Sequence, residues 1–244
     1  LIRELGKFMT NDGALANFIH SIYKPKGESG SLKPTVIMLH GYGAHGLDLL
    51  PLAPHLCGGQ VMVICPQAPF DVELPEGYAM QANNQMFTWE RKDASGDRIA
   101  SDSTEIVSSL QEFVPAAVDE YGGDADRVAV VGFSQGGSLA YRLSLASPEY
   151  YKAVAPLSTW LPDDVIDTAN IRSAVESALP FLVQHGTTDQ MVDIARGRDS
   201  YERLLEKGIN VELKEYPMQH EINQASIADL SSFLSEHLGI NPPQ

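Results

Sequence analysis

Short apolar runs alternate with longer amphipathic segments along most of this chain. Runs of four to six residues, rich in Val, Ile, Leu and Ala, occur at 35–39, 61–65, 127–132, 153–157 and 181–184, and a further strand-length run at 211–216 alternates apolar with charged residues. Strands that are apolar on both faces and separated by helical segments are typical of a parallel sheet covered by helices. The alternation therefore predicts an α/β fold with a mostly parallel central sheet and helices on both faces.

The segments between these runs carry the spacing of amphipathic helices. Residues 99–121 place apolar side chains three or four positions apart and are followed by a pair of glycines. The stripes within 201–205 and 227–234 show the same spacing, and each ends shortly before a glycine. Apolar periodicity that stops at glycine is a helix signal, so we expect helices at these three places.

No change of composition divides the chain, so we expect a single domain over residues 1–244. We interpret residues 1–33 as an N-terminal arm ahead of the first core strand. Two segments are too long for simple connections: 66–98, and 158–180, in which a helix is expected at 164–178. Because long loops in compact domains often carry function, we expect both to be excursions near a binding pocket, and a plain surface excursion stays open for 158–180.

The chain is strongly acidic. Its 244 residues include 17 Lys and Arg against 32 Asp and Glu, a net charge of −15. Such a field repels phosphate backbones, so we expect no nucleic-acid partner. No apolar stretch approaches the roughly 18 residues of a spanning helix, and no basic amphipathic segment suits an anionic bilayer. We therefore expect no stable membrane insertion, while the oligomeric state stays open.

Cys57 and Cys65 are the only cysteines. Two cysteines form no disulfide framework and match no zinc-ligand spacing, so we expect free thiols and no bound metal. We expect a cytoplasmic protein. Because the chain begins at Leu1 rather than at Met, a removed signal peptide, and with it a secreted or periplasmic location, stays open.

The reactive chemistry is concentrated at Gly132, Ser134 and Gly136, which form a G-x-S-x-G motif. The motif follows the run at 127–132 and precedes an amphipathic segment, so Ser134 is predicted at a strand-to-helix turn. Small residues on either side of the serine let the backbones meet closely there. The hydroxyl then lies over a helix N-terminus, which favours developing negative charge. We predict that Ser134 is a catalytic nucleophile.

A serine nucleophile requires a base and an acid, and in folds of this type the acid precedes the histidine along the chain. Asp189 comes just after the run at 181–184, and His220 follows the run at 211–216. The carboxyl ends of parallel strands meet at one edge of a sheet. We therefore predict that Ser134, Asp189 and His220 converge there as a catalytic triad.

Three other residues also follow the serine and are weaker candidates. Asp193 fits the first turn of a helix, where a negative charge is favoured, and His237 fits the end of one, where a cation is favoured. His185 stands at a strand end four residues before Asp189, and we interpret it as a structural turn residue.

Acyl transfer also requires an oxyanion hole made of preorganised N–H donors. One donor is expected from the backbone of Gln135, the residue after the nucleophile. The loop at 40–46 follows an early strand and contains three glycines, so its backbone can approach a substrate closely. We predict the main-chain N–H of Tyr42 as the second donor.

The chain resembles the carboxylesterase/phospholipase family of α/β-hydrolases, which includes acyl-protein thioesterases. The resemblance covers roughly residues 34–238. It rests on GFSQGG at 132–137, LHGYG at 39–43, CPQAP at 65–69, LST at 157–159 and HGTTD at 185–189, followed by His220. It implies an α/β-hydrolase fold and a Ser-His-Asp hydrolase that acts on acyl esters or thioesters without a metal or cofactor.

The resemblance also implies that Trp89 and Met191 line the acyl pocket. We thus predict a serine hydrolase that cleaves carboxylic esters or thioesters of small to medium acyl chains through an acyl-enzyme on Ser134. Its substrate is expected to be a small-molecule acyl ester, with lysophospholipase or acyl-protein thioesterase activity as alternatives. A non-catalytic binding module on the same scaffold is the alternative from another class of protein, because fold alone does not determine function.

Overall fold

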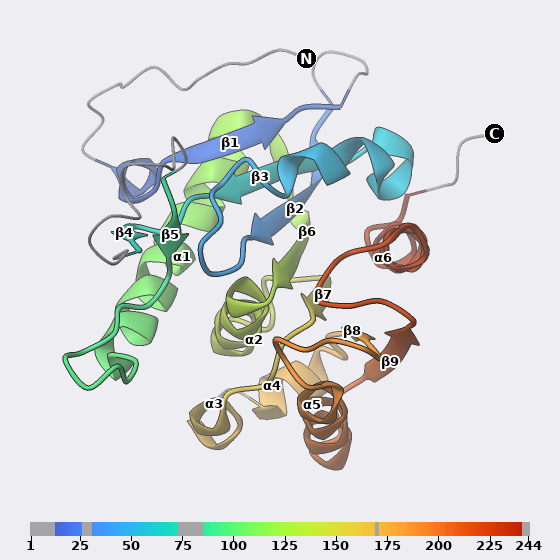
Figure 1. The fold of residues 1–244 in the computed structure, drawn as a ribbon. Coiled ribbons are helices and arrows are strands. Elements are labelled where there is room, and N and C mark those ends of the chain that lie inside the picture. The colour runs from blue at the N-terminus through green and yellow to red at the C-terminus, as the bar shows by residue number, and fades with distance from the viewer. Residues whose placement is uncertain (1–12, 26–30, 73–84, 169–170, 241–244) are drawn as a thin grey trace.

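The computed structural model describes residues 13–25, 31–72, 85–168 and 171–240. Its main feature is a seven-stranded sheet with the order β1-β3-β2-β6-β7-β8-β9 (Figure 1). The strands are β1 (His20–Tyr23), β2 (Lys33–Leu39), β3 (Met62–Pro66), β6 (Gly123–Phe133), β7 (Ala153–Leu157), β8 (Phe181–Gly186) and β9 (Val211–Tyr216). β1 pairs with β3 in the antiparallel sense, and the other pairs are parallel. The prediction of a mostly parallel sheet is confirmed.

Helices cover both faces of this sheet, as predicted (Figure 1). They are η1 (Ala14–Asn17), η2 (Leu50–Gly59), α1 (Ala100–Tyr121), α2 (Gln135–Ala146), α3 (Asp163–Thr168), α4 (Ile171–Glu176), α5 (Ile194–Glu206) and α6 (Gln224–His237). Successive residues of β2 point to opposite faces: Ile37 packs in the core under α1, α2 and α5, whereas Val36 packs in the core under η2 and α6. Burial on both faces explains why the central strands, such as β2, β3 and β7, are mostly apolar.

The interpretation of residues 1–33 as an arm ahead of the sheet needs correction. Residues 20–23 form β1, which pairs with β3 from His20↔Pro66 to Tyr23↔Val63. Phe18 is 4% exposed and packs edge-on against Phe113 of α1. The four-residue strand is half-buried and has a mixed polar pattern, so it lacks the apolar signature of the central strands.

The two long excursions differ in what they build. In the second, where a helix is expected at 164–178, helix is found at Asp163–Thr168 (α3) and at Ile171–Glu176 (α4), and residues 169–170 lie outside the described residues. In the first, residues 73–84 lie outside the described residues. Its described parts contain a separate hairpin of β4 (Phe70–Asp71) and β5 (Phe87–Thr88). Within the described ranges, no helix combines the length and apolar character needed to cross a bilayer.

Candidate active site

Ser134 stands at the turn between β6 and α2, as its motif predicts. Its backbone has φ 54° and ψ −118°, a left-handed conformation that is rare for a residue with a side chain. A Cβ at Gly132 would lie 2.1 Å from the carbonyl oxygen of Gly136, and a Cβ at Gly136 would lie 2.1 Å from that of Leu39. Both glycines are therefore required by the close approach of backbone to backbone.

The strained turn is held by neighbours on β7 and the loop after it. The Ser134 N–H donates to the carbonyl of Leu157 at 2.9 Å, and the Thr159 hydroxyl donates to the Ser134 carbonyl at 2.7 Å. A backbone conformation of this kind costs about 1–3 kcal/mol. These two hydrogen bonds, with the apolar burial of β6 around them, offset that cost.

The structure brings Asp189 and His220 together. Nδ1 of His220 lies 2.8 Å from Oδ2 of Asp189. The other carboxylate oxygen accepts the backbone N–H groups of Met191 and Val192, both at 2.9 Å. Three donors therefore fix the carboxylate, and the imidazole carries its Nδ1 proton toward it. Nε2 is left as the nitrogen that can accept a proton.

The loops that carry this pair are joined by their backbones. Thr188 donates to the Met218 carbonyl twice, through its N–H at 3.2 Å and its hydroxyl at 2.9 Å. A Cβ at Gly186 would lie 2.3 Å from the same carbonyl oxygen, so only glycine permits this approach. The loop after β8 and the loop after β9 thus form one unit, which sets the distance between the acid and the histidine.

The pKa of Asp189 lies below its ordinary value. Burial of the carboxyl group raises this pKa, but hydrogen bonds from Val192, His220 and Met191 favour the charged form and outweigh it. Asp189 is therefore a carboxylate at neutral pH. It can orient the His220 ring and stabilise an imidazolium without taking a proton.

The Asp189–His220 pair lies beside the serine turn. The His220 ring packs against the ring of Phe133, the residue before Ser134, with centroids 4.8 Å apart. On the other side, a Cβ at Gly41 would lie 3.3 Å from the Cβ of Ser134, so the loop at 40–46 borders the serine directly. The Asp189–His220 pair and the predicted oxyanion loop therefore both border the turn that carries Ser134, at the carboxyl ends of β6, β8, β9 and β2.

The backbone N–H groups of Tyr42 and Gln135 are the predicted donors of an oxyanion hole. Within the part of the chain that the structure describes, neither the Tyr42 N–H nor the Gln135 N–H has a protein acceptor. Gln135 is the first residue of α2, where N–H groups lack intrahelical partners. Tyr42 is 52% exposed. Both groups are free to bind a negatively charged oxygen.

The side chain of Gln135 has a separate role. Its Oε1 accepts the backbone N–H of Trp89 at 3.1 Å, and its Nε2 donates to the Thr88 hydroxyl at 3.0 Å. The same short segment bonds to the predicted oxyanion loop, since the Gly43 N–H donates to the Phe87 carbonyl at 2.8 Å. Residues 87–89 therefore link this loop to the serine turn.

Trp89 differs from the expectation that it lines an acyl pocket. Its side chain is 1% exposed and belongs to the core. Its indole N–H donates to the His40 carbonyl at 2.8 Å, and its ring lies 6.1 Å from that of Phe18. A ligand cannot touch a side chain buried in this way. Trp89 instead supports the strand end from which the predicted oxyanion loop leaves.

His40 fixes the start of that loop. Its Nε2 accepts the Ala68 N–H at 3.0 Å, so the proton is on Nδ1, which donates to the Gly41 carbonyl at 2.8 Å. Burial lowers the pKa of His40, and the hydrogen bond to Gly41 opposes this only in part. The ring is therefore neutral, and it aligns two backbone segments rather than taking part in proton transfer.

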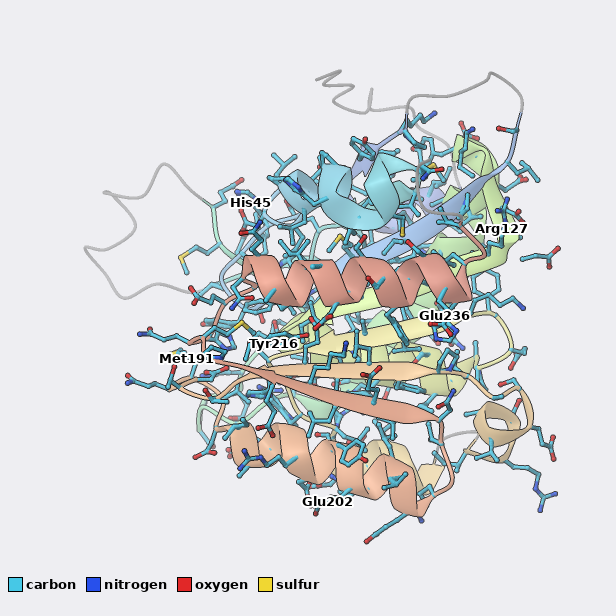
Figure 2. All side chains as sticks on the ribbon, turned by 90° about the vertical axis from the view of Figure 1, so that its right-hand side faces the viewer. His45, Arg127, Met191, Glu202, Tyr216 and Glu236 are labelled. Carbon is cyan, nitrogen blue, oxygen red and sulfur yellow. The ribbon has the colours of Figure 1, made fainter. Side chains whose placement is uncertain are left out.

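Met191, His185 and Asp193, the next predicted or alternative site residues, differ in burial and in their partners. Met191 is 78% exposed, and Figure 2 shows it at the same end of the molecule as His45 of the predicted oxyanion loop. His185 is fully buried, and its Nε2 lies 2.8 Å from the Val192 carbonyl. Asp193 is the N-cap of α5, where it accepts the Ala195 N–H. The structure thus gives both of these alternatives structural partners.

His237, the third alternative, lies in the last turn of α6, packed against Phe233. Glu236, its neighbour, lies at the far end of the molecule from Met191 (Figure 2). Sequence reasoning did not assign the support provided by His40, Thr159 and the Gln135 side chain. Their neighbours in space come from other strands, and no short-range pattern indicates them. Within the described residues, no three His, Cys, Asp or Glu side chains gather as a metal site.

A sheet of this topology, with a strained serine after β6 and an Asp–His pair on the loops after β8 and β9, defines the α/β-hydrolase class. A sequence profile of the phospholipase/carboxylesterase family matches residues 21–238, and the chain belongs to that family. The match begins ahead of residue 34, where the resemblance starts, and takes in all but the first residue of β1.

Two relatives support the same class. The chain is 31% identical over 223 residues to acyl-protein thioesterase 1 of Cryptococcus neoformans, covering 84% of this chain and 92% of that protein. It is 27% identical over 215 residues to carboxylesterase SOBER1 of Arabidopsis thaliana, covering 83% and 90%. These relatives and the family make the chain a hydrolase of the carboxylesterase and thioesterase class.

Solved structures show the same fold. The carboxylesterase of Bacillus cereus has a TM-score of 0.71 at 22% identity, covering 90% of this chain and 94% of that chain. Acyl-protein thioesterase 2 of Zea mays has a TM-score of 0.68 at 25% identity, covering 90% and 99%.

Proposed function

We propose that this protein hydrolyses carboxylic esters or thioesters of small to medium acyl chains through an acyl-enzyme on Ser134. The observation that carries the proposal is the 2.8 Å hydrogen bond between His220 and Asp189, formed on loops that border the serine turn. Its substrate is a small-molecule acyl ester.

The first half of the reaction forms the acyl-enzyme. His220 Nε2 takes the proton of the Ser134 hydroxyl as Oγ bonds to the acyl carbon. The carbonyl electron pair moves onto oxygen, and the N–H groups of Tyr42 and Gln135 stabilise this oxyanion. When the tetrahedral intermediate collapses, the bond from the acyl carbon to the alcohol oxygen or thiol sulfur breaks, and His220 returns its proton to the leaving group.

The second half releases the acid. Water donates a proton to His220 as its oxygen bonds to the acyl carbon, and the same oxyanion hole stabilises the new intermediate. The bond to Ser134 Oγ then breaks, and His220 protonates that oxygen. The products are a carboxylic acid and the free enzyme, so the cycle balances without any other reactant. Asp189 keeps the imidazole oriented throughout.

The test uses Ser134→Ala with Ser232→Ala as its matched control. Ser232 is an exposed residue of α6 whose hydroxyl bonds to its own helix, so its loss changes nothing at the site. We expect S134A to remove turnover of a p-nitrophenyl short-chain ester, and labelling by a fluorophosphonate, while the far-UV circular dichroism is unchanged. Full turnover in folded S134A would refute the proposal.

A preference for acyl thioesters over oxygen esters, as in an acyl-protein thioesterase, is a second candidate, supported by the acyl-protein thioesterases among the relatives. A series of p-nitrophenyl esters of increasing chain length, measured beside one acyl-thioester and one lysophospholipid, separates the three activities. We expect the short and medium esters to give the largest kcat/KM. A maximum for the thioester or the lysophospholipid would replace our first choice by the corresponding alternative.

We also propose a cytoplasmic location. Cys57 and Cys65 are both free and buried, and unpaired cysteines fit a reducing compartment. Fractionation of the native cell, with detection by an antibody against this chain, tests this. Recovery outside the cytoplasm would contradict it.

A further inference from the structure

Two arginines from distant parts of the chain gather on one aromatic side chain, Trp160. The guanidinium carbon of Arg98 lies 4.7 Å from the Trp160 ring centroid, and that of Arg196 lies 4.4 Å from it. Arg98 precedes α1, Trp160 follows β7, and Arg196 is the third residue of α5. Two guanidinium groups thus share one aromatic ring in a chain whose net charge is −15.

The Trp160 stack adjoins the serine turn through Thr159. Trp160 directly follows Thr159, whose hydroxyl donates to the Ser134 carbonyl. A Cβ at Gly137, in the first turn of α2, would lie 2.6 Å from the Thr159 methyl group, so the turn that carries Trp160 is pressed against the base of the nucleophile's helix.

The Trp160 stack adjoins the Asp189 loop through α5, which carries Arg196. Gly197 follows Arg196, and a Cβ there would lie 2.5 Å from Nδ1 of His185. Nε2 of His185 in turn lies 3.5 Å from Oδ2 of Asp189. Arg196 is thus one residue from a packing contact that leads directly to the predicted catalytic acid. Met191, on the same loop, lies at the end of the molecule that also carries His45 (Figure 2).

The two cations differ in how far their charge is neutralised. Arg98 forms an ion pair with Glu90 at 3.1 Å. Arg196 is exposed, and among the described residues no carboxylate lies within the 4.0 Å of an ion pair from it. The neighbouring acid, Asp193, accepts the Ala195 N–H as the helix cap. The guanidinium of Arg196 therefore keeps its hydrogen-bond donors available to an external partner.

An arginine stacked on an indole is well suited to bind an anion. Stacking holds the planar guanidinium in one orientation, so less conformational entropy is lost when it binds. Its fork of N–H groups matches a carboxylate or a phosphate in a bidentate arrangement. The surrounding negative field weakens non-specific attraction of anions, so recognition depends on this local contact.

We propose that Arg196, stacked on Trp160 and assisted by Arg98, forms an anion-binding subsite beside Ser134, and that the preferred substrates are esters carrying a carboxylate. The inference rests on the proposed esterase function and adds a substrate class to it. If the stacking of Arg98 and Arg196 on Trp160 served only to hold these three segments together, the enzyme would show no preference between charged and neutral esters.

The test compares matched pairs of esters. The carboxylate lies on the acyl side in p-nitrophenyl adipate monoester, whose neutral partner is its methyl ester. It lies on the leaving-group side in the butyrate of 4-hydroxybenzoate, whose neutral partner is the butyrate of methyl 4-hydroxybenzoate. The readout is the ratio of kcat/KM for the charged ester to that for the neutral one. Intrinsic reactivity cancels when this ratio is compared between variants.

We expect Arg196→Gln to lower this ratio about five- to tenfold in one pair, while the neutral esters change less than about twofold. The pair that responds locates the subsite on the acyl or the leaving-group side. Arg196→Lys keeps the charge without the fork, so a partial loss is expected. The matched control is Arg198→Gln, which removes an exposed arginine of the same helix that is paired with Glu215. Its ratio should not change.

Added salt should reduce the wild-type ratio, because it screens an exposed charge contact. An unchanged ratio for R196Q in both pairs overturns the subsite. So does an equal loss on charged and neutral esters with a lowered Tm, which marks a structural stack. Failure of the proposed function looks different: S134A and the wild type would then hydrolyse the neutral esters equally.

Discussion

Nδ1 of His220 and Oδ2 of Asp189 lie 2.8 Å apart, and the second carboxylate oxygen is occupied by two backbone N–H groups of its own loop. The carboxylate therefore cannot turn away from the imidazole without breaking contacts within its loop. This arrangement selects the tautomer of His220 that leaves Nε2 free to accept a proton.

Replacing Asp189 by Asn should lower kcat about 10³- to 10⁴-fold, because an amide can donate to Nδ1 and favour the wrong tautomer. KM should change far less, since Asp189 is not expected to touch the substrate. The control is Asp193→Asn, which keeps a good helix cap at α5. Steady-state kinetics on a p-nitrophenyl ester checks both. A loss of similar size in D193N would show that the effect arises from disturbance of the loop.

His40 should make stability depend on pH. Its pKa in the folded protein lies below its ordinary value of 6.5, because it is buried. Between these two values the unfolded chain binds more protons than the folded one, so stability falls as the pH falls below about 6.5. One proton changes the free energy of unfolding by about 1.4 kcal/mol per pH unit.

His40→Gln should remove this contribution. Urea unfolding of wild type and H40Q between about pH 5 and about pH 7.5 brackets the ordinary histidine pKa. The wild-type free energy of unfolding should fall more steeply on the acid side, and the two slopes should agree near the upper limit. The other histidines are common to both proteins and cancel. Parallel profiles over the whole range would contradict the assignment of a neutral, buried His40.

Gly136→Ala should destabilise the serine turn severely. The new Cβ would lie 2.1 Å from the Leu39 carbonyl oxygen, and backbone atoms of a central strand cannot move aside cheaply. We expect a loss of about 3 kcal/mol or more, at the upper end for overpacking, together with loss of turnover. Gly13→Ala, where a Cβ meets nothing within 4 Å, is the control and should unfold at the wild-type urea concentration. Normal stability of G136A would be incompatible with the described turn.

Trp89→Phe distinguishes the observed role of this residue from the expected one. The substitution leaves the His40 carbonyl without its indole donor, which should cost about 1–3 kcal/mol. It should lower kcat for esters of every chain length to the same extent, because it loosens the oxyanion loop. Kinetics on p-nitrophenyl acetate, butyrate and octanoate checks this. A shift of chain-length preference would instead restore Trp89 as a pocket wall.

The parts of the fold that could be predicted are those coded by local pattern. The strand before Ser134, the glycines around it, and the placement of Asp189 and His220 after the following strands all lie within short windows of sequence. Their meeting point follows from the rule that parallel strands end at one edge. The structure adds the geometry, in which loop contacts such as Thr188 to Met218 set the final distance.

The parts that could not be predicted depend on contacts between remote segments. β1 is four residues long and half-buried, so its pairing with β3 is determined by the partner strand rather than by its own pattern. Trp89 reads equally well as a pocket wall or a core residue until Phe18 and His40 are known to surround it. The stacking of Arg98 and Arg196 on Trp160 joins three segments that share no motif.

The left-handed backbone at Ser134 has a consequence for how this protein can change. At that position a glycine is the residue that removes the strain, so Ser134→Gly should be more stable than Ser134→Ala by about 1 kcal/mol. Mutation selected for thermostability alone would therefore tend to replace the residue on which the proposed turnover depends. A serine in this conformation is what we expect where selection for the proposed chemistry outweighs selection for stability.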